Sequence, residues 1–240
     1  MHDFTDRLKE HLLPNTACVI CPVGGTPYIT HNADMRFRSA SVIKLFLLSY
    51  ALEHDDVNAT VRFCDKTHAS ALGELNLESA ALDTLLLMMI ASSDNGATNV
   101  LIDRYDFDTL NAYIRSLKTK ETSINRKMLD YEAIDNGKDN YTCASDVLLI
   151  YKYLASLGTS WERYAGCAKC LDRLMKYIYC GCRFFGKAGD MQGAFHDTGI
   201  LDVSGRRVCA VFLSDSYKDA ENGCGMTGLA ALEALNQGEM

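Results

Sequence analysis

Residues 37–44 read FRSASVIK and lead directly into the apolar run LFLLSYALE at residues 45–53. Serine is favoured where helices begin, so the pattern predicts a buried helix from Ser41 to Glu53. Lys44 follows Ser41 by three residues and therefore shares a helix face with its hydroxyl. A lysine buried in an apolar helix loses its proton more easily and can then act as a base. A helix-capping serine followed by a lysine whose charged end reaches water explains the same pattern, so this segment alone leaves both interpretations open.

The elements around this helix predict one domain over residues 1–240, built as two lobes. We expect helices at 4–13, 41–53, 80–91, 95–104, 107–117, 145–156, 161–179 and 228–236, and strands at 17–23, 26–30, 184–189, 195–203 and 207–213. Strands from both chain ends predict one antiparallel sheet flanked by terminal helices, an α+β lobe of about 1–35 and 183–240. An all-helical lobe of about 36–182 is inserted into it. The polar stretch 118–140 predicts a long loop, which in a compact domain indicates a functional role.

The composition excludes several classes of protein. With 48% hydrophobic and 23% charged residues, the 240-residue chain is an ordinary globular one. The formal net charge of −7 argues against a broad nucleic-acid surface. Apolar runs are far shorter than a bilayer-spanning helix, so we expect no membrane span. Nothing in the pattern indicates an oligomeric state.

Ten cysteines raise the question of a metal site. C-x-x-C spacing is typical of zinc ligands, and the clustered thiols are Cys18, Cys21, Cys167, Cys170, Cys180 and Cys182. The first pair lies in a strand-like run whose alternate residues face opposite sides, and the others lie in a helix-like segment. We therefore expect no metal and no cofactor. The first seven residues carry no signal-peptide pattern, which predicts a cytoplasmic protein, with an exported protein whose signal was removed as the alternative.

Two more short segments carry polar groups suited to catalysis. Ser93-Asp94-Asn95 follows one apolar helix and begins the next, where such residues also serve as helix caps. Lys187-Ala188-Gly189 lies on a strand, where the lysine is equally explained by an exposed sheet edge and the glycine by a close backbone approach.

Taken together and in this order, the three segments resemble the Ser-x-x-Lys, Ser-Asp-Asn and Lys-Thr-Gly motifs of the penicillin-recognising serine hydrolases. The resemblance is greatest to class A β-lactamases and their relatives, and it extends to residues 89–99, 140–142 and 196–200. It implies the β-lactamase/transpeptidase-like fold, with a five-stranded antiparallel sheet, terminal helices and an all-helical lobe.

The resemblance also implies roles for individual residues. Ser41 would be the acylated nucleophile, Lys44 its base, and Ser93 the proton donor to the leaving nitrogen. Asn95 would bind the substrate's amide side chain, and Lys187 would add positive potential near the substrate carboxylate. The backbone N–H groups of Ser41 and Asp190 would form the oxyanion hole, with Gly189 beside them, and such donors stabilise the tetrahedral oxyanion.

Two departures from the family pattern affect the expected chemistry. Ala188 replaces a hydroxyl residue that would bind the substrate carboxylate, and Asp190 adds negative charge nearby. The second concerns deacylation: if Arg126 begins the loop, the position of the family's glutamate falls on Met128. Glu132 lies four residues further on, one helical turn away, and is the expected substitute base.

Asp130 is a second possibility for that base. The alternative is that Asp130, Glu132, Asp135 and Asp139 form only a solvated acidic loop. Acylation would then proceed while hydrolysis was slow.

The sequence therefore predicts a serine hydrolase of the class A β-lactamase-like family that hydrolyses β-lactams inefficiently through a Ser41 acyl-enzyme. The alternatives are a penicillin-binding or D-alanyl peptidase-like protein that deacylates poorly, and a non-catalytic sensor of the same fold. The expected partner is a small β-lactam or peptide-like amide. A Ser/His/Asp triad through His196 and Asp197 is disfavoured, because adjacent strand residues point to opposite faces.

Overall fold

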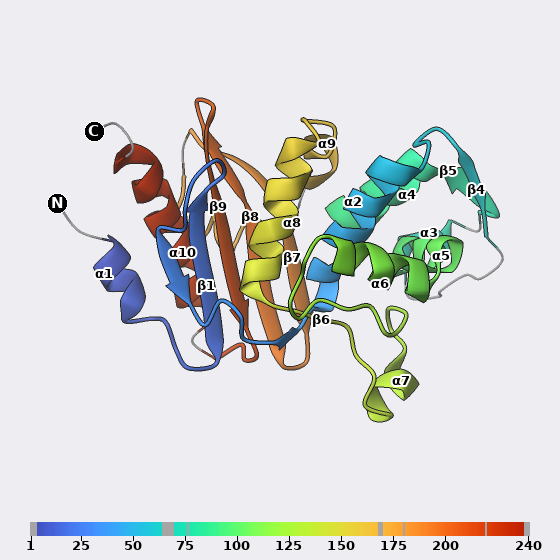
Figure 1. Ribbon diagram of the computed structural model, residues 1–240, viewed down its shortest axis with the longest axis horizontal. Coiled ribbons are helices and arrows are strands. Elements are labelled where there is room, and N and C mark those ends of the chain that lie inside the picture. Colours follow the sequence, from blue (N-terminus) through green and yellow to red (C-terminus); the bar gives the residue numbers. More distant parts are fainter. Residues whose placement is uncertain are drawn as a thin grey trace.

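The computed structural model describes residues 4–63, 70–75, 77–167, 170–179, 181–218 and 220–237. Its centre is a five-stranded antiparallel sheet in the order β2-β1-β9-β8-β7, which joins both ends of the chain (Figure 1). The strands are β1 (Thr16–Pro22), β2 (Ile29–His31), β7 (Arg183–Met191), β8 (Ala194–Val203) and β9 (Arg206–Ser214). The predicted antiparallel sheet built from both termini is confirmed.

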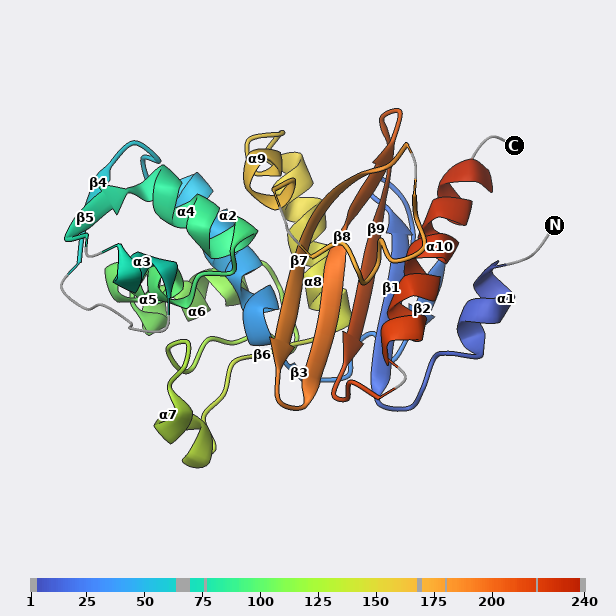
Figure 2. The same cartoon turned by 180° about the vertical axis from the view of Figure 1, so that it is seen from behind.

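Helices cover both faces of the sheet. Helices α1 (Phe4–Lys9) and α10 (Ala220–Gln237) lie on one face and α8 (Ala144–Ser156) on the other (Figure 2). Successive β1 side chains accordingly enter different cores, since Cys18 packs toward α10 and Cys21 belongs to the cluster that includes α8. Helix α8 falls within the range expected for the helical lobe, yet it packs against the sheet strands β1 and β9.

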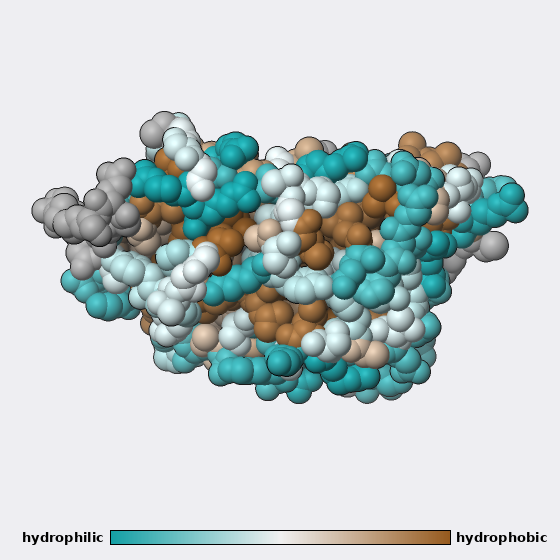
Figure 3. All heavy atoms as spheres, turned by 45° about the horizontal axis from the view of Figure 1, so that its top comes forward, coloured by the Kyte–Doolittle hydropathy of each residue, from teal (hydrophilic) through white to brown (hydrophobic). Residues whose placement is uncertain are grey.

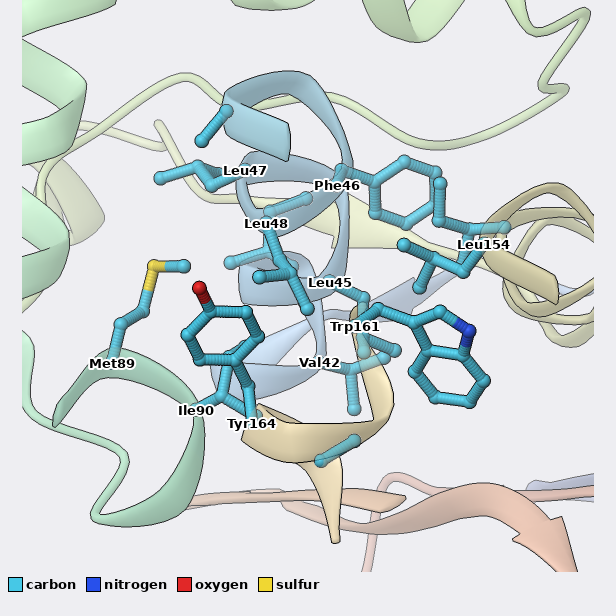
Figure 4. Packing of buried hydrophobic residues seen from close by; sticks show 14 of the residues in the cluster. Val42, Leu45, Phe46, Leu47, Leu48, Met89, Ile90, Leu154, Trp161 and Tyr164 are labelled. Carbon is cyan, nitrogen blue, oxygen red and sulfur yellow. The ribbon is translucent and has the colours of Figure 1, made fainter. Parts of the chain in front are cut away.

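The helical part lies beside strand β7. It contains α2 (Lys44–His54), α3 (Ala71–Glu74), α4 (Leu82–Ala91), α5 (Asn95–Tyr105), α6 (Phe107–Ser116) and α9 (Glu162–Ala165), with a small pair of strands, β4 (Thr60–Arg62) and β5 (Ser79–Ala81). Helix α2 is buried at its centre, where Leu45, Phe46 and Leu48 pack with Trp161 and Tyr164 (Figure 4). Burial of these large side chains anchors the segment that carries Ser41 and Lys44.

The segment before residue 41 is tied to the long loop. Strand β3 (Phe37–Arg38) pairs with β6 (Tyr141–Thr142), which ends the loop. The Ser39 amide adds a hydrogen bond of 2.8 Å to the Asn140 carbonyl. The loop itself contains a short helix, α7 (Tyr131–Asp135), which the sequence pattern did not predict.

Several predicted elements differ in extent. The first helix ends at Lys9 instead of residue 13, β2 begins only at Ile29, and α10 begins eight residues earlier than expected. The predicted helix at 161–179 is wrong for most of its length: among the described residues of that range only α9 is helical, and residues 172–177 form bends and turns. One cause is that a side chain takes the place of a helical hydrogen-bond partner: the Leu174 amide donates to Asp197 Oδ2 at 3.1 Å.

Hydrophilic side chains cover much of the face seen in Figure 3, and hydrophobic atoms reach the surface in patches between them. Within the described part of the chain, no helix has the length and hydropathy to cross a bilayer.

Candidate active site

Ser41 lies in a 3₁₀ turn, η1 (Ala40–Ile43), that precedes helix α2. The sequence predicted an α-helix from Ser41, whereas the regular helix begins at Lys44. A 3₁₀ turn has three residues per turn, so it aligns Ser41 with Lys44 more closely than an α-helix would. Ala40 has a φ of +44°, which is uncommon without glycine and typical of backbone held under strain at functional sites.

Lys44 is completely buried and donates three hydrogen bonds. Its ammonium contacts the Ser93 carbonyl at 2.7 Å, the Ser93 hydroxyl at 3.2 Å and Asn95 Oδ1 at 2.9 Å. Burial lowers the pKa of Lys44 well below its usual value, and the charge of Lys187 lowers it further. Lys44 can therefore lose a proton near neutral pH more readily than an ordinary lysine.

Ser93 joins the two lysines to Ser41. It lies between α4 and α5 with a φ of +54°, and its hydroxyl donates to the Ser41 hydroxyl at 2.9 Å. The same oxygen accepts from Lys44 and, at 3.0 Å, from Lys187. Asp94 is the cap of α5, as the alternative interpretation of this motif held, and its carboxylate accepts from the Ala97 amide.

Lys187 approaches from strand β7 and is almost fully buried. It also donates to the Ala188 carbonyl at 2.8 Å. Burial lowers the pKa of Lys187 to about 8, partly offset by the buried carboxylate of Asp197. At neutral pH this lysine remains mostly charged.

Gly189 and Asp190 bring the edge of β7 against the 3₁₀ turn. A Cβ atom added to Gly189 would lie 3.1 Å from the Ser41 nitrogen and 3.2 Å from Ala40 Cβ. Glycine thus allows β7 to come this close to the Ser41 amide, since a Cβ atom here would force its neighbours to move by a few tenths of an ångström. The Asp190 carboxylate accepts from Arg173 and, at 2.8 Å, from the Tyr217 hydroxyl.

The long loop is closed by a cluster of three charges, in which Arg126 and Asp139 are buried and Arg38 is partly exposed. Asp139 accepts from Arg126 at 2.8 Å through one oxygen and pairs with Arg38 through the other. The side chain of Asn99 fixes the backbone of Met128 through both of its polar atoms: the amide of Met128 donates to Asn99 Oδ1 at 2.7 Å, and its carbonyl accepts from Asn99 Nδ2 at 3.1 Å.

Two pockets meet at Ser41. One of about 480 Å³ extends beneath the loop and is lined by Arg38, Ala40, Ser41, Asn95, Arg126, Met128, Leu129, Tyr131, Ile134, Asp135, Asp190, Met191 and Gln192. We call it the loop pocket. The other, of about 370 Å³, is lined by Ser41, Ile90, Ala91, Ser92, Ser93, Asn95, Cys170, Lys187, Ala188 and Asp190, and we call it the lysine pocket. Together they form a cleft on both sides of the nucleophile.

The predicted deacylation bases lie away from this cleft. Glu132 is exposed on α7 and lines neither pocket. Asp130 caps α7 by accepting from the Ala133 amide at 2.9 Å. Met128 instead lines the loop pocket beside Ser41, so the apolar residue, and not the nearby glutamate, is adjacent to the nucleophile.

His196 and Asp197 do not form a triad with Ser41. Nδ1 of His196 accepts from the Ser214 amide and Nε2 contacts the Arg38 carbonyl at 2.8 Å, so both ring nitrogens have backbone partners. Burial lowers the pKa of His196 to about 4, which keeps the ring neutral. Asp197 is buried and accepts from the Leu174 and Thr198 amides.

No group of three potential metal ligands occurs among the described residues. Cys18 and Cys21 face opposite sides of the sheet, and Cys180 lies outside the described residues.

Arg173 is the site residue that sequence reasoning missed. Its guanidinium donates to the His196 carbonyl at 2.9 Å, contacts the Asp190 carboxylate, and lies over the Phe195 ring. All of these partners come from β7 and β8, which are remote from residue 173 in the sequence, so spacing alone gave no signal.

Comparison with known proteins places these features in a family. The model of the beta-lactamase enzyme family matches residues 14–236. A comparison with curated proteins found no match. Among solved structures, a β-lactamase from Sphaerobacter thermophilus has a TM-score of 0.83 at 23% identity, covering 98% of this chain and 97% of that one.

Two further structures are similar. A mutant of PBP-A, solved as an acyl-enzyme complex with penicillin G, has a TM-score of 0.81 at 18% identity and covers 100% of this chain and 97% of that one. A class A β-lactamase representative from Bacteroides cellulosilyticus has a TM-score of 0.80 at 16% identity, with 98% of each chain covered. The fold is therefore β-lactamase/transpeptidase-like, and the chain belongs to the beta-lactamase enzyme family.

Proposed function

We propose that this protein is a serine hydrolase that forms an acyl-enzyme with β-lactams at Ser41 and hydrolyses it inefficiently. The observation that carries the proposal is the hydroxyl of Ser93, which donates to Ser41 at 2.9 Å while it accepts from both Lys44 and Lys187. A purely structural cluster does not require two buried lysines around one pair of serine hydroxyls, because each buried charge costs free energy.

The arrangement supports a sequence of proton transfers. Neutral Lys44 accepts the proton of Ser41, with Ser93 as the connecting hydroxyl, while the Ser41 oxygen attacks the lactam carbonyl. The amides of Ser41 and Asp190 stabilise the oxyanion, and the close approach at Gly189 brings β7 against the Ser41 amide. Ser93 then gives its proton to the leaving nitrogen as the carbon–nitrogen bond breaks, and the Lys44 ammonium replaces that proton through its hydrogen bond to Ser93, which restores neutral Lys44. Lys187 favours this step because its ammonium group donates to the same Ser93 oxygen, and this positive charge makes the hydroxyl a better acid.

Hydrolysis of the ester requires a base for water. The carboxylates that line the loop pocket with Ser41 are Asp135, which is exposed at the end of α7, and Asp190, which already accepts hydrogen bonds from two other side chains. Met128 lines the loop pocket where the family pattern has glutamate, and Glu132 lies outside it. A thioether cannot accept the proton of an attacking water. The acyl-enzyme should therefore persist, which is also the behaviour of the second candidate, a penicillin-binding protein.

The test is intact-protein mass after mixing with benzylpenicillin, with drug loss followed in parallel. We expect an adduct of the drug's mass on Ser41 and slow continuing drug loss. An adduct with no turnover favours the penicillin-binding function. Absence of any adduct, together with failure of a fluorophosphonate to label Ser41, would favour a non-catalytic member of the family.

A further inference from the structure

The charge distribution of the lysine pocket indicates what the substrate carries on the leaving side of the scissile bond. Ser93 is the proposed proton donor to the leaving group and lines this pocket, so the leaving group occupies it during acylation. This step rests on the proposed function. The residues around that group are then those that select it.

The negative member of the Asp190–Arg173 pair faces the pocket, and the positive member lies behind it. The Asp190 side chain is 45% exposed and lines both pockets, whereas the Arg173 side chain is 10% exposed and lines neither. Arg173 is held by the His196 carbonyl and the Phe195 ring as well as by Asp190. A group in the pocket therefore meets a carboxylate before it meets the guanidinium.

Donors that an anionic leaving group would need are few on this side. Ala188 carries no hydroxyl. Lys187 is the cation that lines the pocket, and two of its three N–H groups already donate to Ser93 and to the Ala188 carbonyl. The three hydrogen bonds of Lys44 go to Ser93 and Asn95. Burying a carboxylate beside Asp190 without new donors costs free energy through like-charge repulsion and lost hydration.

We propose that this site prefers acyl donors whose leaving group is uncharged: esters or amides, including lactams, without a carboxylate next to the scissile bond. Leaving groups that end in a free carboxylate, such as a C-terminal amino acid, are correspondingly disfavoured. Ile90, Ala91 and Ala188 give the lysine pocket apolar walls that suit such a group.

The matched probes are benzylpenicillin and its methyl ester, which differ in this one charge. The second-order rate constant for Ser41 acylation is measured by intact mass for each compound. It is then divided by the rate constant for alkaline hydrolysis of the same compound, which corrects for the different intrinsic reactivities of the two lactams. We expect the ester to react about tenfold faster or more on this corrected scale. A factor of this size corresponds to the charge-assisted hydrogen bond with water that the acid's carboxylate loses in the pocket without a replacement. An acid that reacts as fast as the ester, or faster, overturns the inference.

Two substitutions test the cause. Asp190→Asn removes the repelling charge but keeps the backbone amide, and Ala188→Thr adds a hydroxyl donor. Each substitution should lower the ratio of the ester's corrected acylation rate constant to that of the acid by severalfold. Asp215→Asn is the control, because it removes one exposed charge that lines neither pocket. An unchanged ratio in Asp190→Asn would contradict the inference, whereas no adduct from either compound would refute the proposed function itself.

Discussion

The Ser93 hydroxyl donates to the Ser41 hydroxyl at 2.9 Å, across 52 positions of sequence. Among the hydrogen bonds of the described residues, this is the one that reaches the hydroxyl oxygen of Ser41. Lys44, three residues from Ser41, directs its donors to Ser93 and Asn95. The route from lysine to nucleophile thus runs through Ser93.

Replacing Ser93 with alanine should therefore disconnect the nucleophile from both lysines. We expect Ser93→Ala to lower the acylation rate constant by about 10²- to 10³-fold, the range of a general acid–base contribution. Ser92→Ala is the matched control, since Ser92 lines the same pocket. Acylation is followed by intact mass and folding by circular dichroism. An undiminished rate in Ser93→Ala would mean that Lys44 acts on Ser41 directly.

The pH dependence of acylation should report Lys187. Its charged form donates to Ser93, so acylation should fall as the pH rises through about 8, the pKa to which burial lowers this group. An unfolded lysine has a pKa of about 10.4. Between these values the unfolded chain binds more protons, so this group's contribution to stability increases with pH.

Activity and this stability contribution thus change in opposite directions above pH 8, and unfolding does not explain the loss. The measurement is acylation rate and urea unfolding across pH 6 to 10. Arginine keeps its charge over this range. If the Lys187→Arg variant folds and is acylated, its acylation rate should therefore not fall above pH 8. A decline that persists in Lys187→Arg would assign it to another group.

The sequence predicted the sheet and the three motif segments because these depend on local pattern. Short apolar runs bounded by turn residues specify β7, β8 and β9, and the short spacing within each motif specifies which residues share a turn. What it missed depends on contacts between distant segments. Residues 172–177 have enough apolar side chains to predict a helix, but Leu174 instead donates its amide to Asp197 on β8.

The same reason explains the missed site features. Arg173 becomes part of the site only because β7 and β8 bring Asp190 and His196 together. The position of Glu132 is a similar case: one helical turn from Met128 suggested a shared face, yet α7 leaves it exposed. Helical spacing fixes relative direction only within one helix, and Met128 lies before α7 begins.

The close contact between β7 and the 3₁₀ turn should tolerate no side chain at residue 189. A Cβ there would lie 3.1 to 3.2 Å from Ser41 N, Ala40 Cβ and Val42 Cγ2. Gly189→Ala should push β7 away from the Ser41 amide, widen the oxyanion hole and reduce acylation by about tenfold or more. Gly24→Ala, at a turn where an added Cβ atom would meet nothing within 4 Å, serves as the control for folding yield. A normal acylation rate in Gly189→Ala would show that β7 can accommodate the added methyl group without disturbing the Ser41 amide.

The charge cluster that closes the loop should matter for stability. Asp139 is 4% exposed and forms ion pairs with both Arg126 and Arg38. Asp139→Asn would leave the buried guanidinium of Arg126 without a carboxylate, which costs about 3–5 kcal/mol. Urea denaturation should show this loss, whereas Asp135→Asn, on the exposed end of the same loop, should change stability by about 0.5 kcal/mol or less. Equal stabilities for the two variants would mean that the cluster contributes no more than a surface charge.

The last prediction concerns deacylation and the apolar residue beside Ser41. Met128 lines the loop pocket, and two hydrogen bonds between its backbone and the Asn99 side chain hold it, so a side chain introduced there should point to the same place. Met128→Glu supplies a carboxylate that can activate water, and we expect the acyl-enzyme lifetime to fall by about 10²-fold or more. Met128→Gln has nearly the same size without a base, so it should keep the long lifetime. Glu132→Gln completes the comparison: unchanged turnover is expected from its exposed position, and a slower turnover would identify Glu132 as the base and place Met128 outside the hydrolytic step.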